Sequence, residues 1–204
     1  MPRLIASALY QLHSKLKSFL SSLSRALYFS PIFRSKTSQC GKNLFLYGGL
    51  PYIAGPLDIQ LGHNCRISGK TTFTGRMSNK ISPQLIVGDN VDIGWQSTIA
   101  VGRKVSLGDN VRIAGGCFMA GYPGHPVQAL ARAKGLPDND KQAKDIILDH
   151  DVWVGTGVTI IGGVHIGHSS IIAAGSVVTK SLPSGVLAGG NPATVIRKLS
   201  KNEE

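Results

Sequence analysis

Residues 148 to 183, taken in groups of six, are LDHDVW, VGTGVT, IIGGVH, IGHSSI, IAAGSV and VTKSLP. The first position of every group is aliphatic, and the fifth holds a valine, serine or leucine that can point inward. The first-position residues are Leu148, Val154, Ile160, Ile166, Ile172 and Val178, and the fifth-position residues are Val152, Val158, Val164, Ser170, Ser176 and Leu182. Six consecutive matches indicate an internal repeat of six residues.

The same period occurs earlier in the chain with less regularity. The groups are LGHNCR and ISGKTT from residue 61, VGDNVD and IGWQST from residue 87, and, after a two-residue slip, VGRKVS, LGDNVR and IAGGCF from residue 101. Such a repeat predicts a solenoid in which each group forms one short strand and three groups complete a triangular turn. Glycines or Asp-Asn pairs would form the corners, where φ is often positive. We expect an all-β solenoid over residues 39–190, closed by a short helical cap at residues 191–204.

The N-terminal part of the chain follows a different period. Apolar residues between residues 4 and 27 recur at steps of three and four, which predicts an amphipathic helix. Pro31 interrupts this pattern, so we expect a linker over residues 28–38 and a first unit spanning residues 1–38. The apolar face either lies on a membrane surface, with Lys and Arg facing anionic headgroups, or packs on the same domain or on a partner subunit.

Charge and cysteine content restrict the setting of the protein. The formal net charge is +11, and seven Lys or Arg residues but no acidic residue precede Asp58. Such a segment attracts anionic lipid, nucleic acid or a phosphorylated substrate alike. The three cysteines, Cys40, Cys65 and Cys117, have no CxxC spacing and fit a reducing, cytoplasmic setting better than a disulfide framework or a zinc site. With no apolar run of about 18 residues and no clear cleavage site, we expect neither a transmembrane helix nor a signal peptide.

Residues 122–145 lack the six-residue period. This segment, YPGHPVQALARAKGLPDNDKQAKD, contains three prolines and must leave the solenoid as a loop. It holds a single histidine, His125, between Gly124 and Pro126, which would restrict the backbone and aim the ring. An imidazole with a pKa near ~6.5 can accept a proton from a hydroxyl group at neutral pH. A loop histidine without further context is more often simply solvated.

The six-residue groups resemble those of the hexapeptide-repeat acyltransferases. From residue 121 onward the chain is similar to the maltose, galactoside and xenobiotic acetyltransferase branch, in GHP within a long loop, VWVGTGVTIIGGVHIG, AAGSVVTKSLPSGVLAGGNPA and VIRKL. The resemblance implies a left-handed parallel β-helix assembled as a homotrimer. It also implies an acetyl-CoA-dependent O-acetyltransferase in which His125 is the general base for direct transfer, with neither a metal nor a nucleic-acid partner.

The resemblance further implies how acetyl-CoA is held. It assigns cofactor contacts to Trp153, Gly155, Thr156, Ala174, Thr179, Lys180 and Arg197. The diphosphate and 3′-phosphate of coenzyme A require cations, for which Lys180 and Arg197 are the candidates. Without the resemblance, Trp153 would be interpreted as a packing residue between subunits and Lys180 as a solvated corner.

The acceptor is less well determined. Family members hold it partly through an asparagine and an aspartate ahead of the loop, where a loose alignment gives Gly94 or Gln96 and Gly102. We expect Trp95, Gln96 and Tyr122 to contact a sugar, while a packed corner explains the first two equally well. The basic helix favours a membrane-proximal acceptor, such as a lipid-linked glycan for a surface polysaccharide at the inner face of the membrane. A small soluble acceptor (a free sugar, an amino acid or a xenobiotic) is the alternative.

Two other functions share the expected fold. Metal-dependent carbonic anhydrases need converging histidines, and His165 and His168 occupy outward positions with no natural third ligand beside His125. A non-catalytic scaffold would use the solenoid only to present surfaces, and it would tolerate the loss of His125. The intact loop and the VTK corner at residues 178–180 favour the enzyme.

Overall fold

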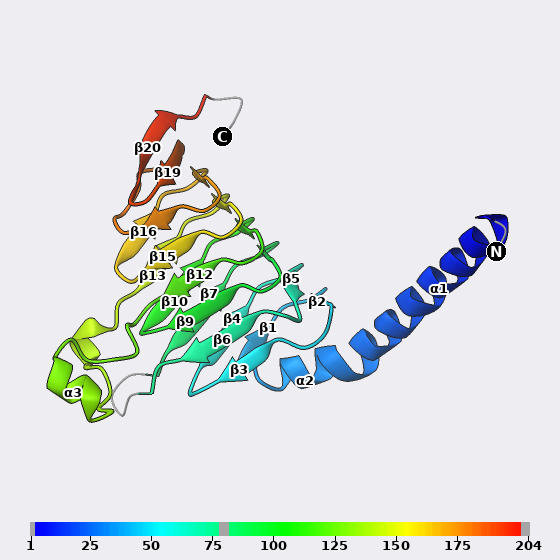
Figure 1. The fold of residues 1–204 in the computed structure, drawn as a ribbon, viewed down its shortest axis with the longest axis horizontal. Helices are drawn as coiled ribbons and strands as arrows, with labels where there is room; N and C mark the ends of the chain where they lie inside the picture. The colour runs from blue at the N-terminus through cyan, green and yellow to red at the C-terminus, as the bar shows by residue number, and fades with distance from the viewer. Residues whose placement is uncertain (1–2, 78–81, 201–204) are drawn as a thin grey trace.

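Three sheets run the length of the body in the computed structural model, which describes residues 3–77 and 82–200 (Figure 1). Sheet A contains β1 (Gln39–Cys40), β4 (Asp58–Leu61), β7 (Gln84–Val87), β10 (Lys104–Leu107), β13 (Ile146–Leu148) and β16 (Val164–Ile166). Sheet B contains β2 (Phe45–Tyr47), β5 (Arg66–Ser68), β8 (Asp92–Ile93), β11 (Arg112–Ile113), β14 (Trp153–Val154), β17 (Ile171–Ile172), β19 (Val186–Gly190) and β20 (Ala193–Lys198). Sheet C contains β3 (Tyr52–Ala54), β6 (Thr72–Gly75), β9 (Thr98–Val101), β12 (Phe118–Ala120), β15 (Thr159–Ile161) and β18 (Val177–Val178).

The chain visits the sheets in the order A, B, C and then repeats this path. β7, β8 and β9 form one coil, and β10, β11 and β12 form the next, in register with it. Neighbouring coils pair in parallel through all three sheets, and among the strands of the described residues only the pair β19 and β20 is antiparallel. The structure is therefore the parallel β-helix that the six-residue repeat predicts.

The first and fifth positions of the repeat form the interior of this β-helix. All the residues named at these positions in the stretch 148–183 are buried, none of them more than 8% exposed. Side chains alternate between the two faces of a strand, so each short strand turns one aliphatic side chain inward. Ser170 and Ser176 are buried as well, and their hydroxyls donate to the carbonyl oxygens of Pro183 at 2.9 Å and Ala173 at 2.6 Å. The repeat thus predicts the core correctly, including its polar positions.

Asparagines form the corner between sheets A and B, and we call it the A–B corner. Asn90 and Asn110 have φ values of +55° and +60°, a left-handed conformation that asparagine tolerates better than most residues. Their side chains also pair: Asn90 Nδ2 donates to Asn110 Oδ1 at 2.7 Å, and Asn110 Nδ2 donates to Asp151 Oδ1 at 2.8 Å. The corner chemistry expected from the Asp-Asn pairs is confirmed.

The predicted amphipathic helix is present and longer than expected. α1 (Arg3–Ser24) continues through a π-helical turn (Arg25–Phe29) into α2 (Ser30–Arg34), and α1 projects away from the β-helix (Figure 1). The linker expected over residues 28–38 is therefore wrong over much of its length. Pro31 lies in the first turn of α2, directly after the π-helical turn, and this local departure from α-helical geometry accommodates a residue that lacks an N–H.

Contacts of two aromatic rings, among others, attach these helices to the first two coils. The guanidinium of Arg25 stacks 4.0 Å above the ring centroid of Phe45 in β2. Phe33 of α2 is completely buried, with its ring centroid 6.4 Å from that of Phe73 in β6. α1 itself has no buried residue. None of the helices in the described ranges is both long enough and apolar enough to cross a bilayer.

The helical cap expected at residues 191–204 is wrong for the part that the structure describes. β20 (Ala193–Lys198) folds back on β19 as an antiparallel hairpin that runs from Val186 opposite Lys198 to Gly190 opposite Ala193, with a register shift between Leu187 and Ala188. Thr194, Val195 and Ile196 are consecutive β-branched residues, which favour a strand over a helix. Residues 201–204 of the expected cap lie outside the described residues.

Candidate active site

The segment between β12 and β13 leaves the β-helix as a loop at the corner where sheet C meets sheet A, called here the C–A corner (Figure 1). It contains α3 (Ala129–Ala133) and a 3₁₀ turn (Asp140–Gln142). His125 is exposed in this loop and has no hydrogen-bond partner among the described residues. The preceding Gly124 has φ +76°, a conformation that glycine adopts without strain, and the following Pro126 is buried. The described residues thus leave the ring of His125 exposed to solvent, while they constrain the backbone on either side of it.

A buried ion pair holds the loop against the body. Arg76, which directly follows β6, donates from Nε to Asp138 Oδ1 at 2.7 Å and from Nη1 to Asp140 Oδ1 at 2.7 Å. Its Nη2 also donates to the Asp138 carbonyl oxygen at 2.8 Å. Burial alone would lower the pKa of Arg76, but the hydrogen bonds to both carboxylates outweigh it and raise the pKa. The other oxygen of Asp138 accepts the N–H of Gly124 at 3.3 Å.

A pocket of about 370 Å³ lies at the base of the loop on the same corner. Its lining residues are Ala120, Gly121, Tyr122, Pro123, Gln142, Lys144, Ile161 and Gly162. The hydroxyl of Tyr122 lies 3.4 Å from Thr74 Oγ1, so this residue is half-buried at the pocket wall. Lys144 is exposed there, and sequence reasoning missed it. The available signal was its position just before the repeat resumes at Ile146.

A second group of predicted residues lies on the corner between sheets B and C, the B–C corner. Successive coils are bonded there, since the N–H of Gly116 donates to the Trp95 carbonyl oxygen at 2.8 Å and that of Gly175 to the Thr156 carbonyl oxygen at 2.8 Å. Trp95, Gln96, Thr156 and Ala174 therefore occupy one column. Gly155 adjoins it, where a Cβ atom would lie 2.7 Å from the backbone nitrogen of Ala174. Only glycine permits this close approach of two coils.

The remaining predicted residues lie elsewhere. Thr179 and Lys180 follow β18 and so sit on the C–A corner, two coils beyond the base of the loop. Trp153 and Arg197 lie on the outer face of sheet B. One chain therefore brings His125, Tyr122 and Lys180 to one corner, with the Trp95 column across sheet C from them.

Comparison with known proteins shows the same repeat. The family model described as the hexapeptide repeat of succinyl-transferase matches residues 84–119 and 146–180. The chain is thus a hexapeptide-repeat protein, and it is similar to acyltransferases that contain this repeat. It is 36% identical over 118 residues to a galactoside O-acetyltransferase of Escherichia coli, covering 58% of this chain and 56% of that protein. It is 32% identical over 146 residues to a galactoside O-acetyltransferase of Lactococcus lactis, covering 71% and 65%.

Solved structures of this family share the fold. The N-acyltransferase AntD from Bacillus cereus, in complex with dTDP and 3-hydroxybutyryl-CoA, has a TM-score of 0.66 at 17% identity, over 85% of this chain and 89% of that one. The likeness supports the left-handed form of the β-helix. This chain spans less than two thirds of the length of the two curated relatives.

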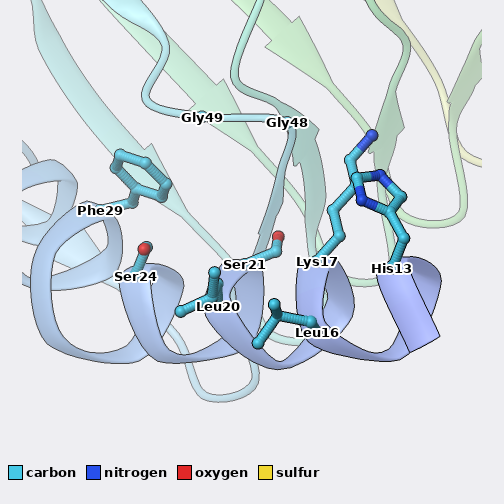
Figure 2. Close-up of a pocket in the computed structure, with 9 residues that line it drawn as sticks. All are labelled: His13, Leu16, Lys17, Leu20, Ser21, Ser24, Phe29, Gly48 and Gly49. Carbon is cyan, nitrogen blue, oxygen red and sulfur yellow. The ribbon is translucent and has the colours of Figure 1, made fainter. Parts of the chain in front are cut away.

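A further cavity lies near the N-terminal end of the β-helix, outside the segments matched by the hexapeptide-repeat model. It has a volume of about 460 Å³ and lies between α1 and the turn Gly48–Gly49 (Figure 2). Its other lining residues are His13, Leu16, Lys17, Leu20, Ser21, Ser24 and Phe29. None of the residues that the sequence predicts for the site lines it. Figure 2 shows the side chains of His13 and Lys17 at the same end of this cavity.

The histidines of the last coils lie away from the loop and contact other side chains. His165 Nε2 lies 2.9 Å from Asp149 Oδ1, and the rings of His150 and His168 stack with centroids 4.9 Å apart. His165 lies in sheet A and His168 on the A–B corner, so the structure does not bring them to His125. Within residues 3–77 and 82–200, no group of three or more His, Cys, Asp or Glu side chains is arranged to hold a metal ion.

Proposed function

We propose that this protein is an acetyl-CoA-dependent O-acetyltransferase that modifies a sugar hydroxyl during synthesis of a surface or extracellular polysaccharide. The observation that carries the proposal is the extruded loop on a hexapeptide-repeat β-helix, which exposes His125 without a hydrogen-bond partner among the described residues and has a pocket at its base, lined by Tyr122 and Pro123. Its galactoside O-acetyltransferase relatives support a sugar acceptor, and the acyl-CoA complex of AntD supports acetyl-CoA as the donor.

The proposed mechanism is direct transfer. His125 takes the proton of the acceptor hydroxyl while that oxygen attacks the thioester carbonyl carbon, and the imidazolium then returns the proton to the departing thiolate. The cysteines are poor nucleophiles here, because burial raises the pKa of the Cys65 and Cys117 thiols. Burial also raises the pKa of the Cys40 thiol, and the positive charge of Arg34 offsets this only in part. A mechanism without an acyl-enzyme is consistent with these thiols.

The residues present fit acetyl-CoA. Lys180 is an exposed cation, and the guanidinium of Arg197 is exposed on β20, so both can meet phosphate groups. Gly155 and Ala174 have little or no side chain, so they leave space along the B–C corner for the pantetheine arm. For the acceptor, the indole of Trp95 is 56% exposed and can stack on a sugar ring, with Gln96 and Tyr122 as hydroxyl contacts.

The experiment that tests this function combines calorimetry with an acetyl-transfer assay. Titration with acetyl-CoA should give saturable binding that Lys180→Ala weakens. Transfer is then measured as release of free coenzyme A with galactosides, undecaprenyl-linked sugars and an amino acid as acceptors. Transfer to free sugars or amino acids alone would favour the small-acceptor alternative. Absence of acetyl-CoA binding would overturn the proposal in favour of a scaffold.

We also propose a homotrimer in which each site lies between two copies. The proposal rests on the division of the predicted residues between the C–A and B–C corners of one chain. Mixed oligomers of His125→Ala and Trp95→Ala chains, whose substitutions lie on the C–A and B–C corners, should regain about a quarter of the wild-type activity, because a neighbour supplies the missing group. Mixtures of His125→Ala and Lys180→Ala, both on the C–A corner, should regain none. Equal results for the two mixtures would overturn the arrangement.

Peripheral membrane contact through residues 4–27 is the last part of the proposal. The apolar face of α1 is uncovered, with Leu12 and Phe19 each 64% exposed, and no acidic residue lies among the first 57 residues. If three such helices packed on one another, all the charged side chains brought together would be cations. An anionic bilayer would instead neutralise these positive charges. Together with three free cysteines, this favours the cytoplasmic face of the membrane.

Vesicle sedimentation tests the membrane contact. The protein should co-sediment with phosphatidylglycerol vesicles and much less with phosphatidylcholine vesicles or at high salt. The pair Leu12→Ser and Phe19→Ser should abolish binding. Tyr10→Ser, which removes a 73% exposed side chain from the opposite face of α1, is the matched control. Binding that survives the pair of substitutions would remove the membrane from the proposal.

A further inference from the structure

Two arginine side chains fix the backbone on both sides of His125. Before the histidine, the N–H of Gly124 donates to Asp138, whose carboxylate is bound by Arg76. After it, Nη1 of Arg132 donates to the carbonyl oxygens of Pro126, at 3.1 Å, and Val127. The histidine is therefore placed by its neighbours, because its own ring has no partner among the described residues.

Arg76 and Arg132 belong to different parts of the molecule. Arg132 belongs to α3 and moves with the loop, whereas Arg76 follows β6 in the body, 62 residues before Asp138. Arg76 is only 4% exposed, and Nε, Nη1 and Nη2 each donate to a loop acceptor. A guanidinium holds its donors in one plane, so these three bonds fix both the position and the tilt of the segment around Asp138.

The carboxylate of Asp138 transmits this placement. Its Oδ1 accepts from Arg76 and its Oδ2 accepts from Gly124, so the two bonds share one planar group. The Asp138 side chain is 5% exposed, and water is thereby kept from replacing either bond. A shift of Arg76 must displace Gly124, and through it the adjoining His125.

We propose that Arg76 is a positioning residue for His125. It acts through Asp138 and Gly124 and determines where the imidazole ring lies relative to the β-helix. The inference rests on the proposed function, since it takes His125 to be the general base. Catalysis by a base is sensitive to misplacement, and a displacement of about 1 Å can cost about 10²-fold in rate.

Steady-state kinetics and calorimetry give the first test. Arg76→Gln and Asp138→Leu should each lower kcat by about 10²-fold with little change in the KM for the acceptor. The dissociation constant for acetyl-CoA should stay within about twofold, because the positions assigned to the cofactor are untouched. Arg76→Lys should not restore kcat, since one ammonium cannot reproduce the planar set of bonds. Lys134→Gln removes an exposed cation of the same loop and is the matched control.

Hydrogen exchange gives a readout that does not depend on activity. Peptides covering residues 121–128 should exchange faster in Arg76→Gln than in Lys134→Gln, while those from residues 84–120 should not change. If Arg76→Gln fails to fold, Asp138→Asn replaces it, because the single amide oxygen of asparagine can accept from only one of Arg76 and Gly124, which interrupts the same chain of contacts with little change in side-chain volume. The same loss of kcat and local gain in exchange is then expected.

The outcomes separate the two proposals. A folded Arg76→Gln protein with wild-type kcat, beside an inactive His125→Ala protein, would overturn the positioning role alone. Loss of kcat without faster exchange at residues 121–128 would also overturn it. Full activity of His125→Ala would overturn the proposed function, and with it the positioning role.

Discussion

Trp153 and Arg197 lie on one outward-facing row of sheet B, connected through Ile171 and Leu187. The register pairs Trp153 with Ile171, Ile171 with Leu187, and Leu187 with Arg197. Three strand spacings, about 14 Å, separate the backbone of Trp153 from that of Arg197. This row exists because β20 is a strand, since a helix at the same residues would not extend sheet B.

The row gives a prediction for cofactor binding. Trp153→Ala and Arg197→Ala should each weaken acetyl-CoA binding by about 10- to 100-fold, as expected for loss of a stacking surface or of a hydrogen bond to a charged group. Isothermal titration calorimetry measures this directly. Arg66→Ala lies on the same row at the far end of sheet B and should bind as the wild type does. Equal weakening by Arg66→Ala would indicate a general charge effect.

The loop histidine gives a prediction for the chemical step. His125→Ala should lower the transfer rate by about 10²- to 10⁴-fold and leave acetyl-CoA affinity nearly unchanged. His150→Ala, an exposed histidine on the A–B corner, serves as the control and should keep the wild-type rate. Parallel loss of rate and affinity in His125→Ala would mean that the loop holds the cofactor.

The asparagine corner gives a prediction for stability. Asn110 combines a φ of +60° with hydrogen bonds to Asn90 and Asp151. Asn110→Ala should destabilise the protein by about 1–3 kcal/mol, because it loses those bonds and places a Cβ in a strained conformation. Asn110→Gly should cost less, since glycine accepts that φ. Urea unfolding of the two variants measures the difference, and equal midpoints would show that backbone strain contributes nothing.

The buried cysteines give a prediction for pH dependence. Burial raises the pKa of the Cys65 and Cys117 thiols, so the unfolded chain loses these protons at a lower pH than the folded one. Their contribution to stability is complete below the unfolded pKa of about 8.5 and is lost as the pH rises toward the folded value. The melting temperature of the wild type should therefore fall more between about pH 8 and pH 10 than that of a Cys65→Ala, Cys117→Ala variant. If the melting temperatures of the two proteins fell equally with pH, the result would contradict the raised pKa of the two buried thiols.

The interior of the β-helix was predictable from sequence because burial there is periodic. Whether a residue such as Ile160 or Val152 points inward depends only on its position in the group of six, and this position can be read from the local sequence. Loop 122–145 was visible for the same reason, as the one long segment between Leu107 and Val178 without the period.

The two ends of the chain were harder because local preferences conflict there. Pro31 usually ends a helix, but the π-helical turn before it lets the helix resume. The segment 193–198 was expected to be helical, whereas its β-branched residues and an available edge on β19 produce a strand. Arg76 and Asp138 could not be paired from sequence at all, since contact across 62 residues depends on the fold.

The closed ends of the β-helix also bear on solubility. A stack of parallel strands would otherwise offer open edges to which another molecule could add, as protofilaments grow. At the first coil, α2 inserts Phe33 into the interior, and at the last, β20 turns back with Arg197 and Lys198 on the outermost strand of sheet B. These two ends act as stops against end-to-end polymerisation, so truncations that remove either one should convert a discrete protein into one that forms fibrils.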